Sequence, residues 1–447
     1  EAIMEDSAMA ALFPDTTYGV ESGGDPDVIP SLSFREFTEF HRRFYHPSNS
    51  YIYLYGDMDI EETLAFIDGE YLSHFQRHAV DSAVRTQSPF TRRKQLEERY
   101  GIAAGEEERQ KAIHSLYIAC SDHMTTAESM GLKILNYTLI EMDGAPLKKA
   151  VVDAGIGSDL TGSYSDSYKQ PVWEIETTGS EPEKAQAFAQ VLDGTFRTLA
   201  LSGLDRDMLH AALNRTEFML RESDYQGRPK GLFYGVRLMD LWLYDRDPMD
   251  ALRYYDDLKT LREGVDSGFF ESLLLKYVLK NDHQVLITMK AEKGLTEKKN
   301  RETEENLAAY KHSLTGEQLD ELIAQTKALK ERQASGESPD ALATIPILSR
   351  DDLKRTIREE TFEEGAAEGV THLHYRADTS GISYVNLFFT LYGLETEEIP
   401  YAYLLANLLS GMDTERRTYR ELTRLSDAST GGPTFSVNPY NPAGHAA

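Results

Sequence analysis

An internal repeat constrains the fold of this chain more than any other feature of its sequence. Three short segments recur in the same order at an offset of about 270 residues. One short match would carry little information, but three in register indicate a duplicated domain. Each copy runs strand, helix, Met-Asp loop, helix, glycine turn and strand. The matched segments are Leu116-Tyr117-Ile118 with Leu387-Phe388-Phe389, Met142-Asp143 with Met412-Asp413, and Thr161-Gly162-Ser163 with Thr430-Gly431-Gly432.

The residues before the first copy predict two helices and a strand. Ser33 and Glu36 form a capping box at the start of a helix that runs to Tyr45 and repeats phenylalanine at helical spacing. Aromatic and β-branched residues at 51–55 predict a short strand, and a capped helix follows from Asp59 to about Phe75. Residues 79–109 are charged and lack periodicity. We interpret them as a linker between domains, with an edge strand at its end as an option.

The first copy alternates strands and helices. Thr125 and Glu128 form a second capping box, and Pro146 begins another helix. We expect strands at 114–119, 160–166, 172–177 and 284–289, and helices at 125–141, from 146, at 180–201 and three times within 205–261.

Residues 295–333 have a different character, because they are highly charged and contain few helix breakers besides Thr315-Gly316. They predict two antiparallel helices, whose second arm carries a sparse apolar stripe. A polar hairpin of this length is typical of a connector between domains. Residues 335–348 are expected to form a loop.

Composition limits the possible classes of protein. A chain of 447 residues with 40% hydrophobic and 27% charged residues is a globular chain of two or three domains. No apolar run approaches the roughly 20 residues that span a bilayer. A net charge of −27 argues against nucleic acid and anionic membranes as partners and favours basic ones, although acidity also serves solubility alone.

The single cysteine, Cys120, cannot form an intrachain disulfide. We therefore expect a reducing compartment, or a fold that needs no disulfides. Because Cys120 ends an apolar strand, we expect a buried and unreactive thiol. The expected location is cytoplasmic, of the bacterial type, with an organellar matrix as the alternative.

The histidines do not form a recognisable metal site. The sequence contains neither His-Glu-x-x-His nor His-x-x-Glu-His. His41 and His46 are five residues apart, which puts them on different sides of a helix. His372 and His374 would share one face of a strand and could both touch one zinc ion, but no third ligand is evident, so an ordinary strand face is the favoured interpretation.

Other catalytic motifs are also missing. There is no Gly-x-Ser-x-Gly elbow of a serine hydrolase and no phosphate-binding Gly-x-x-x-x-Gly-Lys loop. Gly23-Gly24-Asp25-Pro26 predicts a turn that is too short and too acidic to hold a phosphate.

Several segments together resemble the pitrilysin (insulinase-like) family of zinc metallopeptidases, in its presequence-protease and falcilysin branch. They are Tyr18–Pro26, the run Phe40–Asn49 with its His46-Pro47-Ser48-Asn49, Tyr55-Gly56-Asp57, the stretches 155–165 and 232–242, the charged hairpin and the restart near Ile382. The resemblance covers nearly the whole chain.

The resemblance implies a large peptidase of four related α+β domains, each an antiparallel sheet packed with helices. Two halves, joined by a long helical hairpin, close around unstructured peptides. It identifies 1–78 as the end of the first domain, 79–109 as a linker, 110–294 as the second domain, 295–350 as the hinge and 351–447 as the start of a truncated third domain. The zinc site belongs to the full-length parent. No catalytic or metal-binding residue is assigned in this chain, and its substrate-binding residues are unidentified.

These implications lead to one expected function and two alternatives. The chain begins at Glu1 and ends at Ala447 within the second copy, so we expect a central piece of a peptidase that is inactive alone. Its partners would be unstructured peptides, basic ones among them, and the remaining domains of the parent. The alternatives are a pitrilysin-like scaffold without catalysis and an acidic peptide-binding protein.

Overall fold

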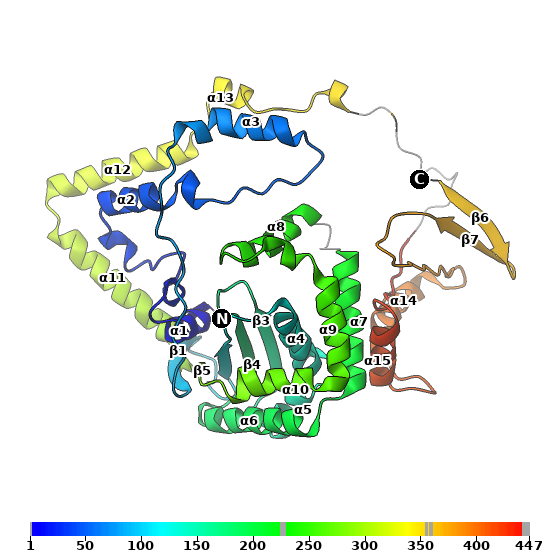
Figure 1. The fold of residues 1–447 in the computed structure, drawn as a ribbon. Helices are drawn as coiled ribbons and strands as arrows, with labels where there is room; N and C mark the ends of the chain where they lie inside the picture. The colour runs from blue at the N-terminus through cyan, green and yellow to red at the C-terminus, as the bar shows by residue number, and fades with distance from the viewer. Residues whose placement is uncertain (1, 224–228, 354–355, 357–360, 440–447) are drawn as a thin grey trace. The chain divides into compact units, whose positions relative to one another are not determined.

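The computed structural model of the protein describes residues 2–223, 229–353, 356 and 361–439 (Figure 1). The chain divides into two compact units. One contains 1–100, 105–293 and 382–447, and the other contains 101–104 and 294–381. The expected α+β class is confirmed, because helices pack on an antiparallel sheet.

The sheet consists of β1 (Lys94–Ile102), β2 (Ala112–Ala119), β3 (Asp159–Ser165), β4 (Val172–Ser180) and β5 (Gln284–Lys293). Its strand order is β1-β5-β2-β4-β3. The central strand β2 pairs antiparallel with β4 and β5, and β4 pairs antiparallel with β3, the last strand. All four strands expected in the first copy are confirmed, and β1 is an edge strand at the end of the 79–109 segment.

The two faces of the sheet belong to two hydrophobic clusters, because successive side chains of a strand point to opposite faces. In β2, Leu116 and Ile118 contribute to the larger cluster, whereas Tyr117 and Ala119 contribute to the smaller one. Trp173 of β4 lies in the larger cluster, is fully buried and meets Phe196 edge to face at 5.8 Å.

Helices of the first copy supply the larger cluster and cover that face of the sheet (Figure 1). Their bounds agree with the expected segments to within a few residues. The helices of the first copy that follow β2 are α4 (Thr126–Asn136), α5 (Pro146–Asp153), α6 (Ala185–Ser202), α7 (Arg206–Glu222), α8 (Lys230–Trp242), α9 (Tyr254–Ser267) and the short α10 (Phe269–Leu273), which has no counterpart among the expected helices.

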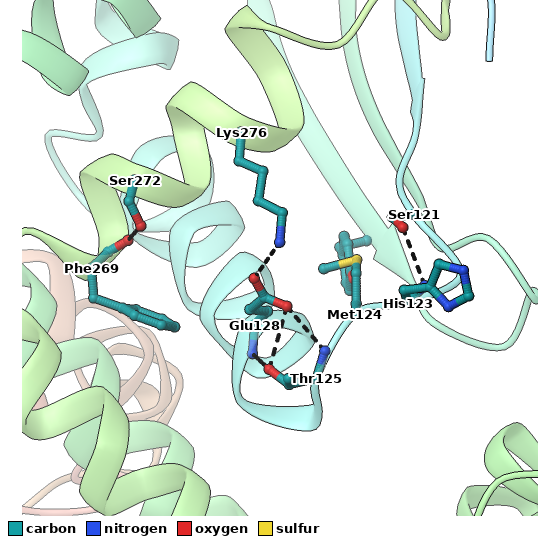
Figure 2. Close-up of polar contacts among 9 residues, drawn as sticks. Ser121, His123, Met124, Thr125, Glu128, Phe269, Ser272 and Lys276 are labelled. Carbon is teal, nitrogen blue, oxygen red and sulfur yellow. Dashed lines mark hydrogen bonds and ion pairs between the residues drawn. The ribbon is translucent and has the colours of Figure 1, made fainter.

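Local capping determines where α4 begins. Figure 2 shows the reciprocal capping box, in which Glu128 N donates to Thr125 Oγ1 at 3.1 Å and Thr125 N donates to Glu128 Oε2 at 3.0 Å. Lys276 Nζ pairs with the other oxygen of Glu128 at 2.7 Å. The predicted capping boxes at Thr125 and Ser33 are both confirmed. Both follow from residues close in sequence.

The opposite face of the sheet is covered by α1 (Ala2–Leu12), which buries Met4, Ala8 and Leu12. His283 Nε2 lies 2.8 Å from the carbonyl oxygen of Leu12. Two further helices follow in sequence, α2 (Phe34–Phe44) and α3 (Ile60–Glu70), and confirm the two expected there.

The strand expected at 51–55 is not formed. This segment is extended but has no strand partner within the described ranges. Its aromatic rings instead pack on α8 where the helix carries glycines: a Cβ on Gly235 would lie 2.8 Å from the Tyr53 ring, and one on Gly231 would lie 2.1 Å from the Tyr55 ring. The aromatic composition correctly predicted an extended backbone. A strand also needs a neighbouring strand to pair with, and composition does not predict that partner.

The second compact unit contains α11 (Leu295–Ser313), α12 (Gly316–Ala334), the short helix α13 (Pro339–Ala343), β6 (Phe362–Ala367) and β7 (Val370–Tyr375). Thr315 caps α12 with a capping box. The two predicted helices are confirmed, but no side chain of either arm is buried, and α13 interrupts the expected loop at 335–348. Leu322 and Ile323, which belong to the expected apolar stripe of α12, remain 43% and 57% exposed, and the expected antiparallel packing of α11 against α12 is not formed among the described residues.

The second copy reproduces the helices of the repeat but not its strands. α14 (Ile399–Leu408) and α15 (Tyr419–Ser429) flank Met412-Asp413, as α4 and α5 flank Met142-Asp143. The run Leu387-Phe388-Phe389 is extended, and no strand pairs with it in the described part of the chain. The expected strand here was wrong. Separately, none of the helices within the described ranges has the length and apolar character needed to cross a membrane.

Candidate functional site

An acidic groove of about 240 Å³ lies on the sheet face that carries α1. Its lining comes from α1 and from β2, β3 and β4, and comprises Met4, Glu5, Tyr117, Thr161, Gly162, Ser163, Glu174 and Glu176. Strand register brings these residues together: Glu174 lies opposite Tyr117 on one side and opposite Ser163 on the other. The sheet register and the packing of α1 on this face therefore bring together side chains from residues 4 to 176.

Alternation along β4 explains why two glutamates reach this groove. Trp173 and Ile175 point into the larger hydrophobic cluster, so Glu174 and Glu176 between them point to the opposite face. Sequence reasoning did not single out either glutamate. The Trp-Glu-Ile-Glu alternation was the signal that could have found them, because it marks a strand with one apolar and one polar face.

Tyr117 lines the groove, Tyr168 lies near its glutamates, and both phenols remain protonated. Burial, followed by the charges of Glu174, Glu176 and Glu5, raises the pKa of Tyr117 well above its usual range. Burial and the carboxylates of Glu5 and Glu174 also raise the pKa of Tyr168. Neutral phenols beside carboxylates form a surface suited to an ammonium or guanidinium group, through charge-assisted hydrogen bonds and contact with the ring faces.

The floor of the groove is fixed by a buried polar network behind β3. Asn136 Oδ1 accepts a hydrogen bond from Trp173 Nε1 at 2.8 Å, and Asn136 Nδ2 donates to the Gly162 carbonyl at 3.2 Å. A Cβ on Gly162 would lie 2.3 Å from Asn136 Oδ1, so this position of the edge strand requires glycine. β3 is thus held rigidly, although it is the last strand of the sheet.

The segment after α1 is anchored to the same unit by hydroxyl groups. Tyr18 Oη accepts from the Lys169 backbone N–H at 3.1 Å and lies 2.5 Å from Tyr244 Oη. Because Tyr244 donates to the Ser167 carbonyl at 2.8 Å, the Tyr18 hydroxyl is the donor in the Tyr18–Tyr244 bond. The anchor holds the segment that follows α1 against the connection between β3 and β4.

The His46-Pro47-Ser48-Asn49 motif builds a turn. Asn49 Nδ2 donates to the Phe44 carbonyl at the end of α2, and Ser48 Oγ accepts from the His78 backbone N–H at 3.2 Å. His46 Nδ1 accepts from the Ser48 N–H, whereas the His41 ring stacks on Tyr45. The structure therefore does not bring His41 and His46 to a common site. Gly24, with φ of +88°, lies in the predicted turn at 23–26.

The remaining candidate residues are not among those that line the groove. His372 and His374 lie on β7, where His374 faces Glu363 of β6 with an N–O distance of 3.7 Å. In the portion of the chain that the structure describes, no group of three or more His, Cys, Asp or Glu side chains could hold a metal ion. The described residues therefore do not fit a catalytic zinc site. Cys120 is buried, as expected, and burial raises its pKa to about 12.

Comparisons with known proteins give the same family along most of the chain. The family model described as peptidase M16 inactive domain matches residues 31–216, and the model described as associated with the C subgroup of the M16 peptidases matches residues 289–446. The fold is similar to the crystal structure of a protease from Helicobacter pylori, with a TM-score of 0.50 and 12% identity, covering 64% of this chain and 66% of that one.

Curated relatives extend this similarity. The chain is 38% identical to protein HypA of Clostridium perfringens over 95% of its own length and 44% of the relative. It is 33% identical to the chloroplastic/mitochondrial presequence protease 1 of Arabidopsis thaliana, over 97% of its length and 40% of the relative. The chain thus spans less than half the length of these relatives. It belongs to the pitrilysin-type M16 family of metallopeptidases, in the presequence-protease-like C subgroup.

Proposed function

We propose that this chain forms the central, peptide-binding part of a zinc-dependent peptidase that degrades unstructured peptides, and that the zinc site lies elsewhere in the parent protein. The observation that carries the proposal is the acidic groove beside the edge strand β3. An edge strand offers backbone groups to an extended peptide, and neighbouring pockets select its side chains. The family relationship supports peptides as the ligand class.

The charge of the groove indicates the preferred peptides. Three glutamates line it, from α1 and β4. A lysine or arginine side chain about 4 Å from one carboxylate gains about 1 kcal/mol in water and more in a partly enclosed groove. We therefore propose that basic unstructured peptides bind more tightly than acidic ones, and that salt weakens the preference.

The domain organisation belongs to the same proposal. Residues 110–294 form the second domain, 295–350 act as the hinge and 351–447 begin the third domain. The polar helices α11 and α12 favour a connector, since neither contributes a buried side chain. The bacterial cytoplasm remains the proposed compartment, with an organellar matrix as the alternative.

Binding of labelled peptides to this chain tests the groove. The double variant Glu174→Gln, Glu176→Gln should weaken binding of a basic peptide roughly tenfold at low salt, whereas a matched acidic peptide should bind no more weakly, because the same change removes repulsion. The control is Glu304→Gln with Glu305→Gln, two exposed glutamates of α11, which removes the same charge. Equal affinities for both peptides in the parent chain would refute the role of the groove.

A second measurement separates the peptidase from the scaffold. A chain of the length of the relatives, supplied with zinc, should cleave unstructured peptides. Peptide binding without any cleavage would favour the non-catalytic scaffold instead.

A further inference from the structure

Among the described residues after Met289, only one side chain is buried, and it is a carboxylate. Asp427, in α15 of the second copy, is 7% exposed. A buried carboxylate is costly unless hydrogen bonds and nearby positive charge compensate for lost water. The groups that contact Asp427 therefore identify the surface on which α15 packs.

Asp427 meets the first copy at Tyr137, which follows α4. Tyr137 Oη donates to Asp427 Oδ2 at 3.1 Å. The guanidinium of Arg215, on α7, lies 5.0 Å from the centre of the Tyr137 ring. The phenol thus bridges a cation of the first copy and an anion of the second.

Three further contacts follow one face of α7. Asn214 Nδ2 donates to the Ala428 carbonyl at 2.7 Å, and Tyr384 Oη donates to Glu222 Oε1 at 2.9 Å. Between them, the Phe218 ring lies against Gly431, where a Cβ would approach it to 2.1 Å. Residues 214, 218 and 222 are four apart, so they form one stripe along the helix.

The contact between the two copies contains little apolar burial. Besides Asp427, no described residue of 382–439 is buried. A cavity of about 290 Å³ remains beside α15, lined by Met142, Asp143, Met208, Arg420, Glu421, Thr423 and Arg424. When such a surface separates, its hydrogen bonds are replaced by bonds to water at a small net cost in free energy. Separating a close-packed apolar interface would cost more, because it exposes apolar surface to water.

We propose that the outer face of α7, together with Tyr137, is a releasable docking surface for segment 382–431, and that Asp427 anchors this segment. Docking holds the start of the second copy on the first, and release frees it without unfolding the sheet. The inference concerns this contact alone and does not rest on peptide binding.

Amide hydrogen exchange of the full chain tests whether segment 382–431 is docked on α7. Tyr137→Phe removes one hydrogen bond to a carboxylate, so exchange in α15 and on α7 should rise together by about tenfold. Exchange in the central strand β2 should stay unchanged. The matched control is Tyr401→Phe, which removes a hydroxyl from the 70% exposed tyrosine of α14 and should change neither helix.

A second variant distinguishes loss of the docking contact from a general loss of stability. Asp427→Asn keeps the shape and an acceptor oxygen, so it should raise exchange in α15 by a few-fold, less than Tyr137→Phe does. Unchanged exchange in α15 in both variants would overturn the proposal. A rise of equal size in β2 would also overturn it, since it would mean that Tyr137 serves only the core.

Discussion

In the first copy of the repeat, Leu116-Tyr117-Ile118 lies in the centre of a sheet, with β5 on one side, β4 on the other and a hydrophobic cluster on each face. In the second copy, Leu387, Phe388 and Phe389 are extended and 75%, 80% and 82% exposed. The two runs have similar composition. Their difference teaches that an apolar β-prone run becomes a strand only where other strands supply its hydrogen bonds.

The helices of the two copies differ much less than their strands. The first copy forms α4 and α5, and the second copy forms α14 and α15 at the corresponding positions. A helix satisfies its backbone groups within its own segment and requires only local caps, such as Thr125 and Thr418. This explains why the helices of the repeat form in the second copy whereas its strand does not. That the two copies superpose, with Met142 near Met412, stays a prediction.

The largest expected effect comes from emptying the core of the first copy. Trp173→Ala removes a fully buried ring that packs against Phe196 and bonds Asn136, and should lower the free energy of unfolding by about 3–5 kcal/mol. Phe388→Ala, at an exposed position, should change it by no more than about 0.5 kcal/mol. Urea unfolding followed by circular dichroism measures both. Similar losses in the two variants would mean that the second copy is packed in solution.

A smaller effect should distinguish the glycines of the two copies. Gly162→Ala brings a methyl group 2.3 Å from Asn136 Oδ1 and 2.5 Å from Ile140 Cδ1, and should cost about 1–3 kcal/mol. Gly411→Ala, where no described atom lies within 4 Å of the added carbon, should cost no more than about 0.5 kcal/mol. Thermal unfolding of both variants tests the contrast. A neutral Gly162→Ala would show that β3 can move away from Asn136.

The smallest expected effect is electrostatic and belongs to the first copy. Burial, followed by the charge of Asp166, raises the pKa of Asp240 on α8 to about 6, whereas an unfolded aspartate titrates near about 3.9. The unfolded state therefore loses its proton first, and the protein should lose stability as the pH rises from about 4 to 6. After allowance for partial exposure, this loss is about 1 kcal/mol.

Asp240→Asn should remove that loss, so the variant gains stability relative to the parent across the same pH window and keeps the gain above it. Urea unfolding at several pH values between 4 and 7 measures the difference. The matched control is Asp320→Asn, at an exposed position of α12, which should leave the pH profile of the parent in place. A constant difference between the Asp240 variant and the parent would contradict the assignment.

Local signals in the sequence predicted much of the fold but little of the candidate site. The capping boxes at Ser33 and Thr125 located two helix starts, because a cap involves residues only three apart. The groove joins Glu5 of α1 with Glu174 and Glu176 of β4. No local pattern links residues so far apart in sequence. Alternation along β4 places Glu174 and Glu176 on one face of the sheet, and the packing of α1 on that face adds Glu5.

The sequence by itself determined the family, the α+β class, the helix starts and the strands of the first copy, since these depend on periodicity, caps and motifs. The tertiary structure alone decided three further features. Tyr53 and Tyr55 pack on the glycines of α8 instead of forming a strand, α1 covers one face of the sheet, and Asp427 is buried against Tyr137. Each depends on contacts between distant segments, whose free energy exists only once the chain has brought both partners together.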